Sequence, residues 1–287
     1  MQRTISAMVG KGSVNHNSRK FRAENVDGTR THLNIDYCNE NIKTVYHELF
    51  DDALERYNAK QTRSDRKIKD YYEKIRSSKQ EKPFREILLQ VGGKGNMNAD
   101  TENGELAKQV LDEYYQGFQE RNPQLRVFSA HLHMDEATPH LHIDFVPFTT
   151  GSKRGLDTRV SLKQALATQG FKGGSRGDTE WSQWVQSEKE QLAAVMERYG
   201  IEWEHKGTHE KHLSVLDYKK QEREKEVAVL GAKIEQKQVE LESLSNRVLN
   251  YDKAKDELSN LEFELATAPK YQLPEPEKFM SAKAYKV

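Results

Sequence analysis

Four of the ten histidines in this 287-residue chain lie within the segment HLHMDEATPHLH at 131–142. Side chains on a β-strand point alternately to its two faces, so His140 and His142 share a face if this segment is extended. His133 precedes a short acidic link, and on a paired strand its imidazole can face the same point. Three imidazoles that converge in this way predict a metal site with open coordination positions. The alternative is a surface strand that carries histidines by chance.

The neighbours of these histidines support a rigid site. Leu132 and Leu141 alternate with them and are expected to pack into the core, which would hold the histidine face in place. Glu136, in the link, is well placed for a hydrogen bond that orients a ligand, although it can also be a simple turn residue like Asp135. His131 shares the face of His133 but lies further along the strand, and its role stays open.

Missing residue types narrow the chemistry of such a site. The chain has one cysteine, Cys38, and contains neither HExxH nor HxxEH, which argues against a structural zinc site and a zincin protease. A divalent cation beside phosphate oxygens is the usual arrangement for phosphoryl transfer. Imidazole ligands suit manganese, zinc, nickel or iron, so the residues alone do not fix the metal.

The balance of 45 basic against 45 acidic residues argues at first against a nucleic-acid binder. The zero net charge arises because two basic segments cancel an acidic background: residues 1–35 carry a net charge of +4 and residues 149–177 one of +5. Both segments are rich in small polar residues and predict basic loops. In the first, Arg19 could neutralise a phosphate and His16 could attack phosphorus or move a proton. Two separated basic loops offer a larger positive surface than a small phosphoester substrate needs, which argues against a metal-dependent hydrolase of small phosphoesters.

Strands and helices that could position these residues alternate along residues 1–206. Apolar runs predict strands at 4–9, 31–37, 84–91, 125–134 and 139–148, and helical spacing predicts helices at 42–79, 103–120 and 179–199. The helical segment 42–79 is expected to break near residues 58–64. The link between the last two strands is short enough for a hairpin. We therefore expect an α+β fold on an antiparallel sheet rather than a doubly wound parallel sheet.

Residues 207–268 have a different pattern. Leu230, Ile234, Leu241 and Leu244 belong to a series of apolar residues at three- and four-residue steps among Glu, Lys and Gln, which predicts a coiled coil or long helix. The alternative is one amphipathic helix that folds back on the first domain. Residues 269–287 contain three prolines and are expected to form a tail. Whether the chain is a fragment of a longer protein stays open.

Three motifs together resemble the plasmid mobilisation and recombination (Mob/Pre, or MobV) relaxases of the HUH endonuclease superfamily. They are HNSR at 16–19, RTHLN at 30–34 and HMDEATPHLH at 133–142, and the resemblance covers roughly residues 1–205. It implies a five-stranded antiparallel sheet with helices on its faces. It also implies an enzyme that nicks one strand at a plasmid transfer origin by metal-assisted transesterification. The product is a covalent 5′-phosphate–protein intermediate, which initiates conjugative mobilisation.

The resemblance assigns roles to the residues of these motifs. His133, His140 and His142 would bind a divalent cation, with Mn²⁺ or Mg²⁺ as the expected cofactor. Glu136 would orient or activate the nucleophile, and Arg19 would contact the scissile phosphate.

Most HUH relaxases attack with a tyrosine, whereas the first motif of this family has a histidine there. We therefore expect His16 to be the nucleophile, with Tyr37 and Tyr46 as alternatives. The expected partner is single-stranded or hairpin plasmid origin DNA. The residues predicted to bind it are Arg19, Lys20, Arg22, Arg30, His32, Asn34, Lys153, Arg154, Arg159, Lys172 and Arg176.

Other functions are compatible with the sequence. A rolling-circle replication initiator or a plasmid recombination protein would use the same chemistry, and a non-catalytic DNA-binding coiled-coil protein would use the histidines for a structural metal. The C-terminal helix suggests a homodimer, and the family suggests contacts with coupling or secretion machinery. Every apolar run is far shorter than the roughly 20 residues that cross a bilayer. The first residues contain no long apolar segment, so we do not expect a secretory signal. We therefore expect a cytoplasmic bacterial protein with no membrane span.

Overall fold

The computed structural model describes residues 1–10, 12–205 and 215–272, and of residues 215–219 the backbone only. The chain divides into two units, Met1–Gly207 and Thr208–Val287. In the described part of the chain, each helix is too short or too polar to cross a membrane. The predicted division into a relaxase domain at 1–206, a coiled coil at 207–268 and a tail at 269–287 stays a prediction.

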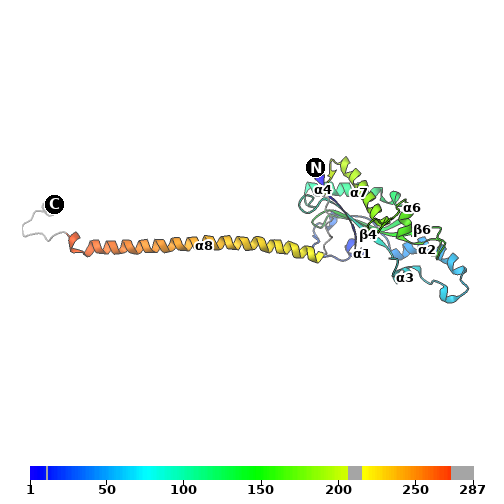
Figure 1. The fold of residues 1–287 in the computed structure, drawn as a ribbon, viewed down its shortest axis with the longest axis horizontal. Coiled ribbons are helices and arrows are strands. Elements are labelled where there is room, and N and C mark those ends of the chain that lie inside the picture. Colours follow the sequence, from blue (N-terminus) through cyan, green and yellow to red (C-terminus); the bar gives the residue numbers. More distant parts are fainter. Residues whose placement is uncertain (11, 206–214, 273–287) are drawn as a thin grey trace, which may run out of the picture. The chain divides into compact units, whose positions relative to one another are not determined.

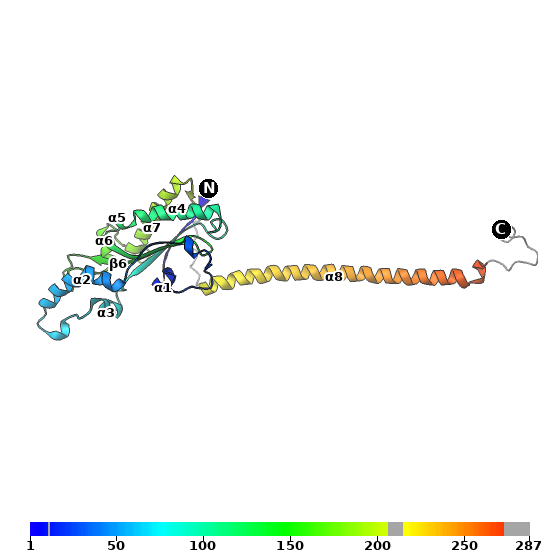
Figure 2. The ribbon, with the colours of Figure 1, turned by 180° about the vertical axis from the view of Figure 1, so that it is seen from behind.

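A sheet of six strands lies at the centre of the first unit (Figures 1 and 2). Five strands pair antiparallel in the order β2–β4–β6–β5–β3, and a sixth, β7, pairs with β6. The strands are β2 Ile5–Val9, β3 Ile35–Asn39, β4 Arg85–Val91, β5 Leu125–His133, β6 His140–Thr149 and β7 Arg159–Val160. The five-stranded prediction was therefore wrong by one strand. With two residues, β7 is too short to leave an alternating pattern in the sequence.

Helices cover both faces of this sheet (Figure 2). On one face lie α4 Glu102–Gln116, α5 Phe118–Arg121, α6 Leu162–Thr168 and α7 Glu180–Arg198. On the other lie α2 Ile42–Ala59 and α3 Tyr71–Arg76. The short elements are α1 Val14–Asn17, η1 Thr31–Leu33, η2 Ser64–Arg66, η3 Pro269–Tyr271, and β1 Gln2–Arg3, which pairs parallel with β8 Glu202–Trp203. The expected α+β class with a mostly antiparallel sheet is confirmed.

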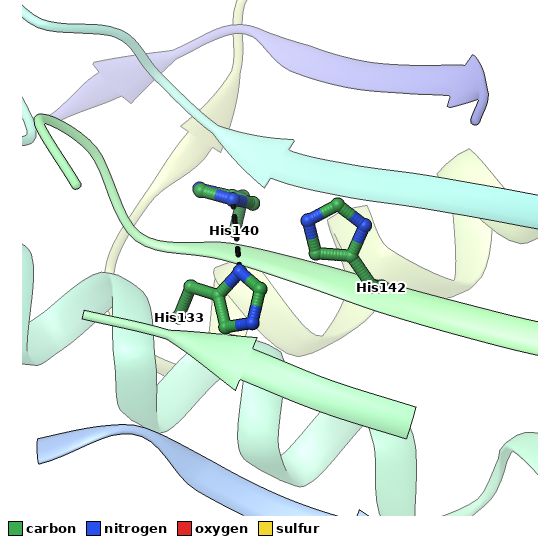
Figure 3. Close-up of side chains that lie close together, drawn as sticks. All are labelled: His133, His140 and His142. Carbon is green, nitrogen blue, oxygen red and sulfur yellow. Dashed lines mark hydrogen bonds between the residues drawn. The ribbon is translucent and has the colours of Figure 1, made fainter. Parts of the chain in front are cut away.

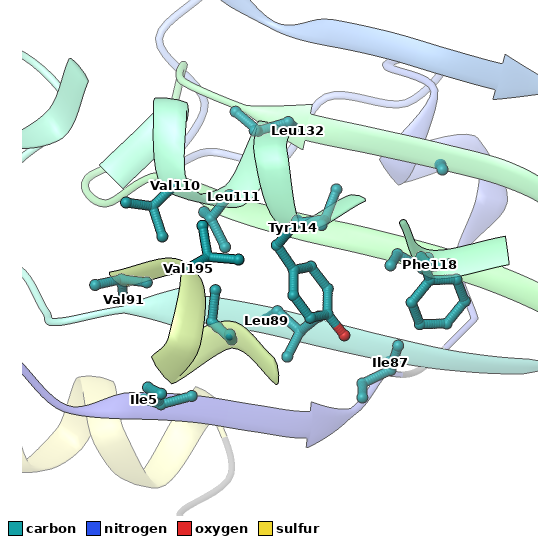
Figure 4. Packing of buried hydrophobic residues seen from close by; sticks show 14 of the residues in the cluster. Ile5, Ile87, Leu89, Val91, Val110, Leu111, Tyr114, Phe118, Leu132 and Val195 are labelled. Carbon is teal, nitrogen blue, oxygen red and sulfur yellow. The ribbon is translucent and has the colours of Figure 1, made fainter. Parts of the chain in front are cut away.

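The face towards α4 and α7 is an apolar core (Figure 4). Leu89, Leu132 and Leu141 are fully buried there against Tyr114 of α4 and Val195 of α7. As predicted, the leucines of β5 and β6 alternate with the histidines. The pleat of the two strands therefore sends the histidines to the opposite face.

Local structure departs from the predictions in three segments. Residues 31–37 are not one strand, because residues 31–33 form a 3-10 turn and β3 begins only at residue 35. The helical segment 42–79 breaks after residue 59, as expected, but the break extends to residue 70. The basic segment 149–177, expected to be a loop, contains β7 and α6. β7 and α6 are short, so neither contains enough repeats of an apolar pattern to be recognised in the sequence.

The second unit contains α8 Val215–Thr267, a single helix of 53 residues. The predicted long C-terminal helix is thus confirmed. The apolar series is exposed in the described chain, with exposed fractions between 49% at Leu244 and 70% at Leu241. Pairing of this helix with another stays a prediction.

Candidate functional site

Three histidines meet on the sheet face opposite the apolar core (Figure 3). His133 of β5 lies across from His140 of β6, and His142 follows two positions later on the same face. Their candidate ligand atoms lie within 4.8 Å of one another, and all three residues are buried. The strand argument expected this convergence, and the structure brings the side chains together. Their role as metal ligands stays a prediction.

Hydrogen bonds behind the rings fix the tautomers of His133 and His140. A carbonyl oxygen can only accept, so His133 must donate from Nε2 to the Asn17 carbonyl at 2.8 Å. By the same reasoning His140 donates from Nδ1 to the Thr138 carbonyl at 2.8 Å. The other nitrogens, Nδ1 of His133 and Nε2 of His140, then carry lone pairs and lie 3.4 Å apart (Figure 3). Two facing lone pairs require a proton or a cation between them.

The third ring is held by a carboxylate. Nδ1 of His142 lies 2.6 Å from Oε1 of Glu86. Burial alone would raise the pKa of Glu86, but the hydrogen bond from His142 and further donors outweigh it and lower that pKa. The ionised carboxylate accepts from Nδ1, so in the neutral ring Nε2 of His142 carries the lone pair, and this buried atom has no hydrogen-bond partner among the described residues. Three lone pairs, each on a ring held from behind by an oxygen, fit a divalent cation.

Burial keeps the His133 and His140 rings in the neutral form that can bind a metal. It lowers the pKa of His140 to about 4 and lowers the pKa of His133 as well. Burial opposes ionisation of Glu136, but the hydrogen bond from His16 and nearby positive charges hold the pKa of Glu136 below its ordinary value. Its Oε1 lies 3.8 Å from Nε2 of His140 and 4.0 Å from Nδ1 of His133. Glu136 therefore offers an ionised oxygen beside two of the lone pairs.

The short helix α1 brings His16 beside the cluster. Its ring centroid lies 6.1 Å from that of His133 and 6.2 Å from that of His142. Nε2 of His16 is 3.5 Å from Oε1 of Glu136. The side chain is 22% exposed, so a substrate can reach it. The structure thus brings together the predicted nucleophile, its acidic partner and the three candidate ligands.

Arg19 has partners that the sequence did not suggest. Its Nε donates to Asp135 Oδ2 at 3.0 Å, and its Nη2 contacts the other oxygen of Asp135 and donates to Glu136 at 3.0 Å. Asn34 donates to the same Asp135 carboxylate at 2.8 Å and accepts from the main-chain N–H of Met134 at 2.7 Å. Asp135, interpreted from the sequence as a turn residue, therefore joins all three motifs. Asn34 was predicted to bind DNA, but both polar atoms of its side-chain amide have hydrogen-bond partners in this turn.

The alternative nucleophiles lie away from the histidines. Tyr37 donates to Asp112 of α4 at 2.7 Å, on the side of the sheet that carries the apolar core. Tyr46 is buried between α2 and α3 and donates to the Pro83 carbonyl at 2.7 Å. Burial raises the pKa of both hydroxyls. Of the three candidates, only His16 lies beside the cluster.

His131 uses both ring nitrogens elsewhere. Nδ1 lies 2.6 Å from Asp36 Oδ1, and Nε2 lies 3.2 Å from the hydroxyl of Ser129. The same hydroxyl donates to Asp144, whose pKa is raised to about 7 by burial and by the charge of Glu86. His131 therefore belongs to a polar network beside the cluster and offers no free nitrogen to a metal.

Sequence reasoning missed Glu86 and Asn17, which support the histidines from behind. Glu86 lies in the strand REILLQV at 85–91, and a charged residue within a largely apolar strand was an available signal. Asn17 lies inside the HNSR motif, but nothing in that motif shows that it is buried.

The predicted DNA-binding residues occupy several surfaces. Lys20, Arg22 and His32 are exposed between α1 and β3, where Arg30 is half-buried, and Lys172 and Arg176 are exposed between α6 and α7. Lys153, Arg154 and Arg159 line an open cleft of about 600 Å³.

The loop that forms this cleft is held in place. Arg159 donates to Ser152 and to Gln164, each at 3.0 Å, and Arg56 of α2 pairs with Asp157 at 2.8 Å. The cleft begins at the end of β6, seven residues from His142, which corresponds to about 23 Å along a strand. It is therefore a basic surface separate from the histidine cluster.

Comparisons with known proteins bear on this site. The model of the Mob_Pre family, plasmid recombination enzymes, matches residues 13–220. Plasmid recombination enzyme type 3 of Staphylococcus aureus and that of Mammaliicoccus lentus are each 26% identical over 157 residues, 53% of this chain and 33% of theirs. The match thus spans about a third of the length of these curated relatives.

Solved structures of the MobM relaxase domain, Mn-bound and in complex with plasmid pMV158 oriT DNA, are also similar. One with 22 nucleotides has 21% sequence identity and a TM-score of 0.46, and covers 76% of this chain and 99% of that one. Another with 23 nucleotides has 19% identity and a TM-score of 0.43, and covers 78% and 99%.

Proposed function

This chain belongs to the Mob/Pre family of plasmid recombination enzymes, and we propose that it is a relaxase that nicks one strand of plasmid origin DNA. The observation that carries the proposal is the placement of His16 beside Glu136 and three inward-facing imidazoles. Such a nick would initiate conjugative mobilisation. The same strand transfer would serve plasmid recombination, which is the activity in the family's description.

His133, His140 and His142 would hold a divalent cation, and we propose Mn²⁺ or Mg²⁺. Such a cation, when bound, draws negative charge from the non-bridging oxygens of a phosphate. Burial of the three rings and the bonds behind them would keep the ligand atoms in position.

His16 would be the nucleophile. Nε2 of His16 lies between Oε1 of ionised Glu136 at 3.5 Å and Nη1 of Arg19 at 3.4 Å, which hold the ring in place. The ring nitrogen that keeps its lone pair would attack phosphorus. As the new P–N bond forms, the P–O3′ bond breaks, and the 3′ oxygen leaves with the electron pair and takes a proton from water. The 5′ phosphate stays joined to the protein. Attack by a 3′ hydroxyl on that bond would reseal the strand.

Arg19 would act mainly by holding the link between β5 and β6. Its guanidinium binds Asp135 and Glu136, so it fixes the acidic partner of His16 while adding positive charge near the scissile phosphate. This role extends the one expected from the sequence, which was direct contact with the phosphate.

Affinity for DNA would come from the exposed basic residues. Lys153 and Arg154 lie on the loop that follows β6, and the end of that strand at Thr149 is about 23 Å along it from His142. A single phosphate at the histidines cannot reach them, whereas a longer DNA segment can. We therefore propose single-stranded or hairpin DNA as the substrate, with binding that weakens steeply as salt is raised.

We also propose that α8 pairs with the same helix of a second copy. Its apolar series is exposed in one chain, and burial of such a series is what stabilises a coiled coil. A Leu241→Glu variant should be monomeric in analytical ultracentrifugation if the unaltered chain is a dimer. A monomeric unaltered chain would contradict this part of the proposal. Contacts with coupling or secretion machinery stay a prediction.

The test of the proposed activity is nicking of a supercoiled mobilisable plasmid in Mn²⁺ or Mg²⁺, followed by mass spectrometry of the covalent adduct. The adduct should lie on His16. His16→Ala should lose at least about 1000-fold in nicking rate, with DNA affinity within about threefold. His47→Ala, an exposed histidine on α2, is the matched control and should nick normally. An adduct on Tyr37 or Tyr46 would contradict the assignment.

A further inference from the structure

Asn17 occupies an unusual position for an asparagine. It is the last residue of α1, directly after His16, and only 1% of it is exposed. Its side-chain amide donates to Glu86 Oε1 at 2.8 Å and to Asp144 Oδ2 at 3.0 Å. Its main-chain carbonyl accepts the hydrogen bond from Nε2 of His133 at 2.8 Å. One residue thus binds two buried carboxyl groups and one candidate metal ligand.

We propose that Asn17 is a positioning residue that couples the placement of His16 to the geometry of the metal site. The inference rests on the proposed function, since it assigns a role around the same nucleophile and the same cation. Asn17 itself touches neither the reacting atoms nor the cation.

Two of the three imidazoles depend on Asn17. It binds His133 directly through its carbonyl, which fixes the tautomer of that ring. It acts on His142 through Glu86, because the Glu86 oxygen that accepts from Asn17 is also the one beside Nδ1 of His142. Loss of the amide would free this carboxylate to move, and the His142 ring with it. Partners of this kind typically change metal affinity 10–100-fold when they are removed.

The loop that carries His16 is docked through the same carboxylate. The N–H of Gly12 donates to the other oxygen of Glu86 at 2.6 Å. At Gly10 a β-carbon would collide with the Glu86 side chain, so the backbone passes directly over it. Glu86 therefore accepts hydrogen bonds from this segment at Gly12 and at Asn17, and Asn17 directly follows His16. A change at Asn17 should for this reason disturb the nucleophile and the ligands together.

The chemistry of an amide explains why asparagine suits this position. Two carboxyl groups side by side need donors between them, and an amide NH₂ supplies two hydrogens from one atom. Leucine has nearly the same shape but no donor, so Asn17→Leu removes both bonds and keeps the volume. Serine keeps one donor.

The test compares Asn17→Leu and Asn17→Ser with Asn15→Leu, the same change at an exposed position of the same short helix. Mn²⁺ affinity is measured by titration calorimetry on the full chain without DNA, and melting temperature is measured with a chelator. We expect Mn²⁺ affinity to fall 10–100-fold in Asn17→Leu, less in Asn17→Ser, and less than twofold in Asn15→Leu. With saturating Mn²⁺, kcat for nicking should fall in the same order while KM for DNA stays within about twofold.

A purely structural role predicts a different result. In that case the melting temperature falls, but Mn²⁺ affinity and kcat of the folded variants stay within twofold of the unaltered protein, which would overturn the proposal. Absence of Mn²⁺ binding by the unaltered protein would overturn it as well. If the unaltered protein binds Mn²⁺ but does not nick DNA, the proposed function fails, and the order of Mn²⁺ affinities still decides the role of Asn17.

Discussion

The two faces of the β5–β6 hairpin are equally buried but are held in place by different forces. Leu132 and Leu141 pack against apolar side chains of α4 and α7, where volume decides the fit. His133, His140 and His142 have partners that must match atom by atom, because a buried polar group without a partner costs free energy. Burial on one face thus gives stability, and burial on the other gives defined tautomers.

The histidine face does not satisfy all of its polar atoms within the described chain, because Nε2 of buried His142 has no hydrogen-bond partner there. Three nitrogen lone pairs converge on it, and the apolar face has no equivalent defect among the described residues. Functional sites often retain such local costs, which the rest of the fold offsets. Substitutions on the two faces should therefore separate function from stability.

The largest effect is expected from His140→Ala. It removes one of three ligands, so nicking should fall at least about 1000-fold and Mn²⁺ affinity at least about 100-fold. The free energy of unfolding, measured with a chelator, should change less than in Leu141→Ala, because the facing lone pairs are relieved. Nicking assays, calorimetry and denaturant titration give the three quantities. Normal nicking by this variant would remove the distinction between the faces.

Leu141→Ala changes the adjacent residue, which points to the other face. Deleting most of a fully buried leucine should lower the free energy of unfolding by about 2–5 kcal/mol. The folded fraction should still nick within about twofold of the normal rate, as measured at a temperature well below the melting point. A loss of Mn²⁺ affinity like that of His140→Ala would show that the two faces are not independent.

The pH dependence of stability should also belong to the histidine face. Burial lowers the pKa of His140 from 6.5 to about 4, so between these values the unfolded chain binds more protons than the fold. Stability of the metal-free protein should therefore decrease as pH falls from 6.5 to 4, by up to about 3 kcal/mol. Denaturant titrations in chelator across this range measure it. Leu141→Ala should lower the whole curve without changing its slope, whereas His140→Ala should make the curve less steep, and the lowered pKa of His133 accounts for the slope that remains.

The smallest effect is expected at the basic cleft. Lys153→Ala should weaken DNA binding by about three- to tenfold at low salt and reduce the slope of log K against log salt by about one. Lys108→Ala on α4, across the sheet from the histidines, should change neither quantity. Fluorescence anisotropy at several salt concentrations distinguishes them. Equal effects of the two variants would mean that DNA does not follow the cleft.

Local sequence patterns were enough to predict much of the fold and part of the candidate site. The hairpin was predictable because strand alternation is a property of neighbouring residues, and it put His133, His140 and His142 on one face while sending Leu141 to the other. β7 was missed because two residues cannot show a period. The motif resemblance supplied roles for His16 and Arg19, which alternation could not.

The sequence by itself determined which residue types share each face of the hairpin, since the pleat repeats every two residues wherever the strand lies. Only the tertiary structure decided their partners. Glu86 is 56 positions from His142, and Asn17 is 116 from His133 and 127 from Asp144. A hydrogen bond depends on distances of a few ångströms between such distant segments, and local periodicity contains no information about them. For the same reason the tautomers of the three histidines, and the assignment of Asn17, follow from packing rather than from the motifs.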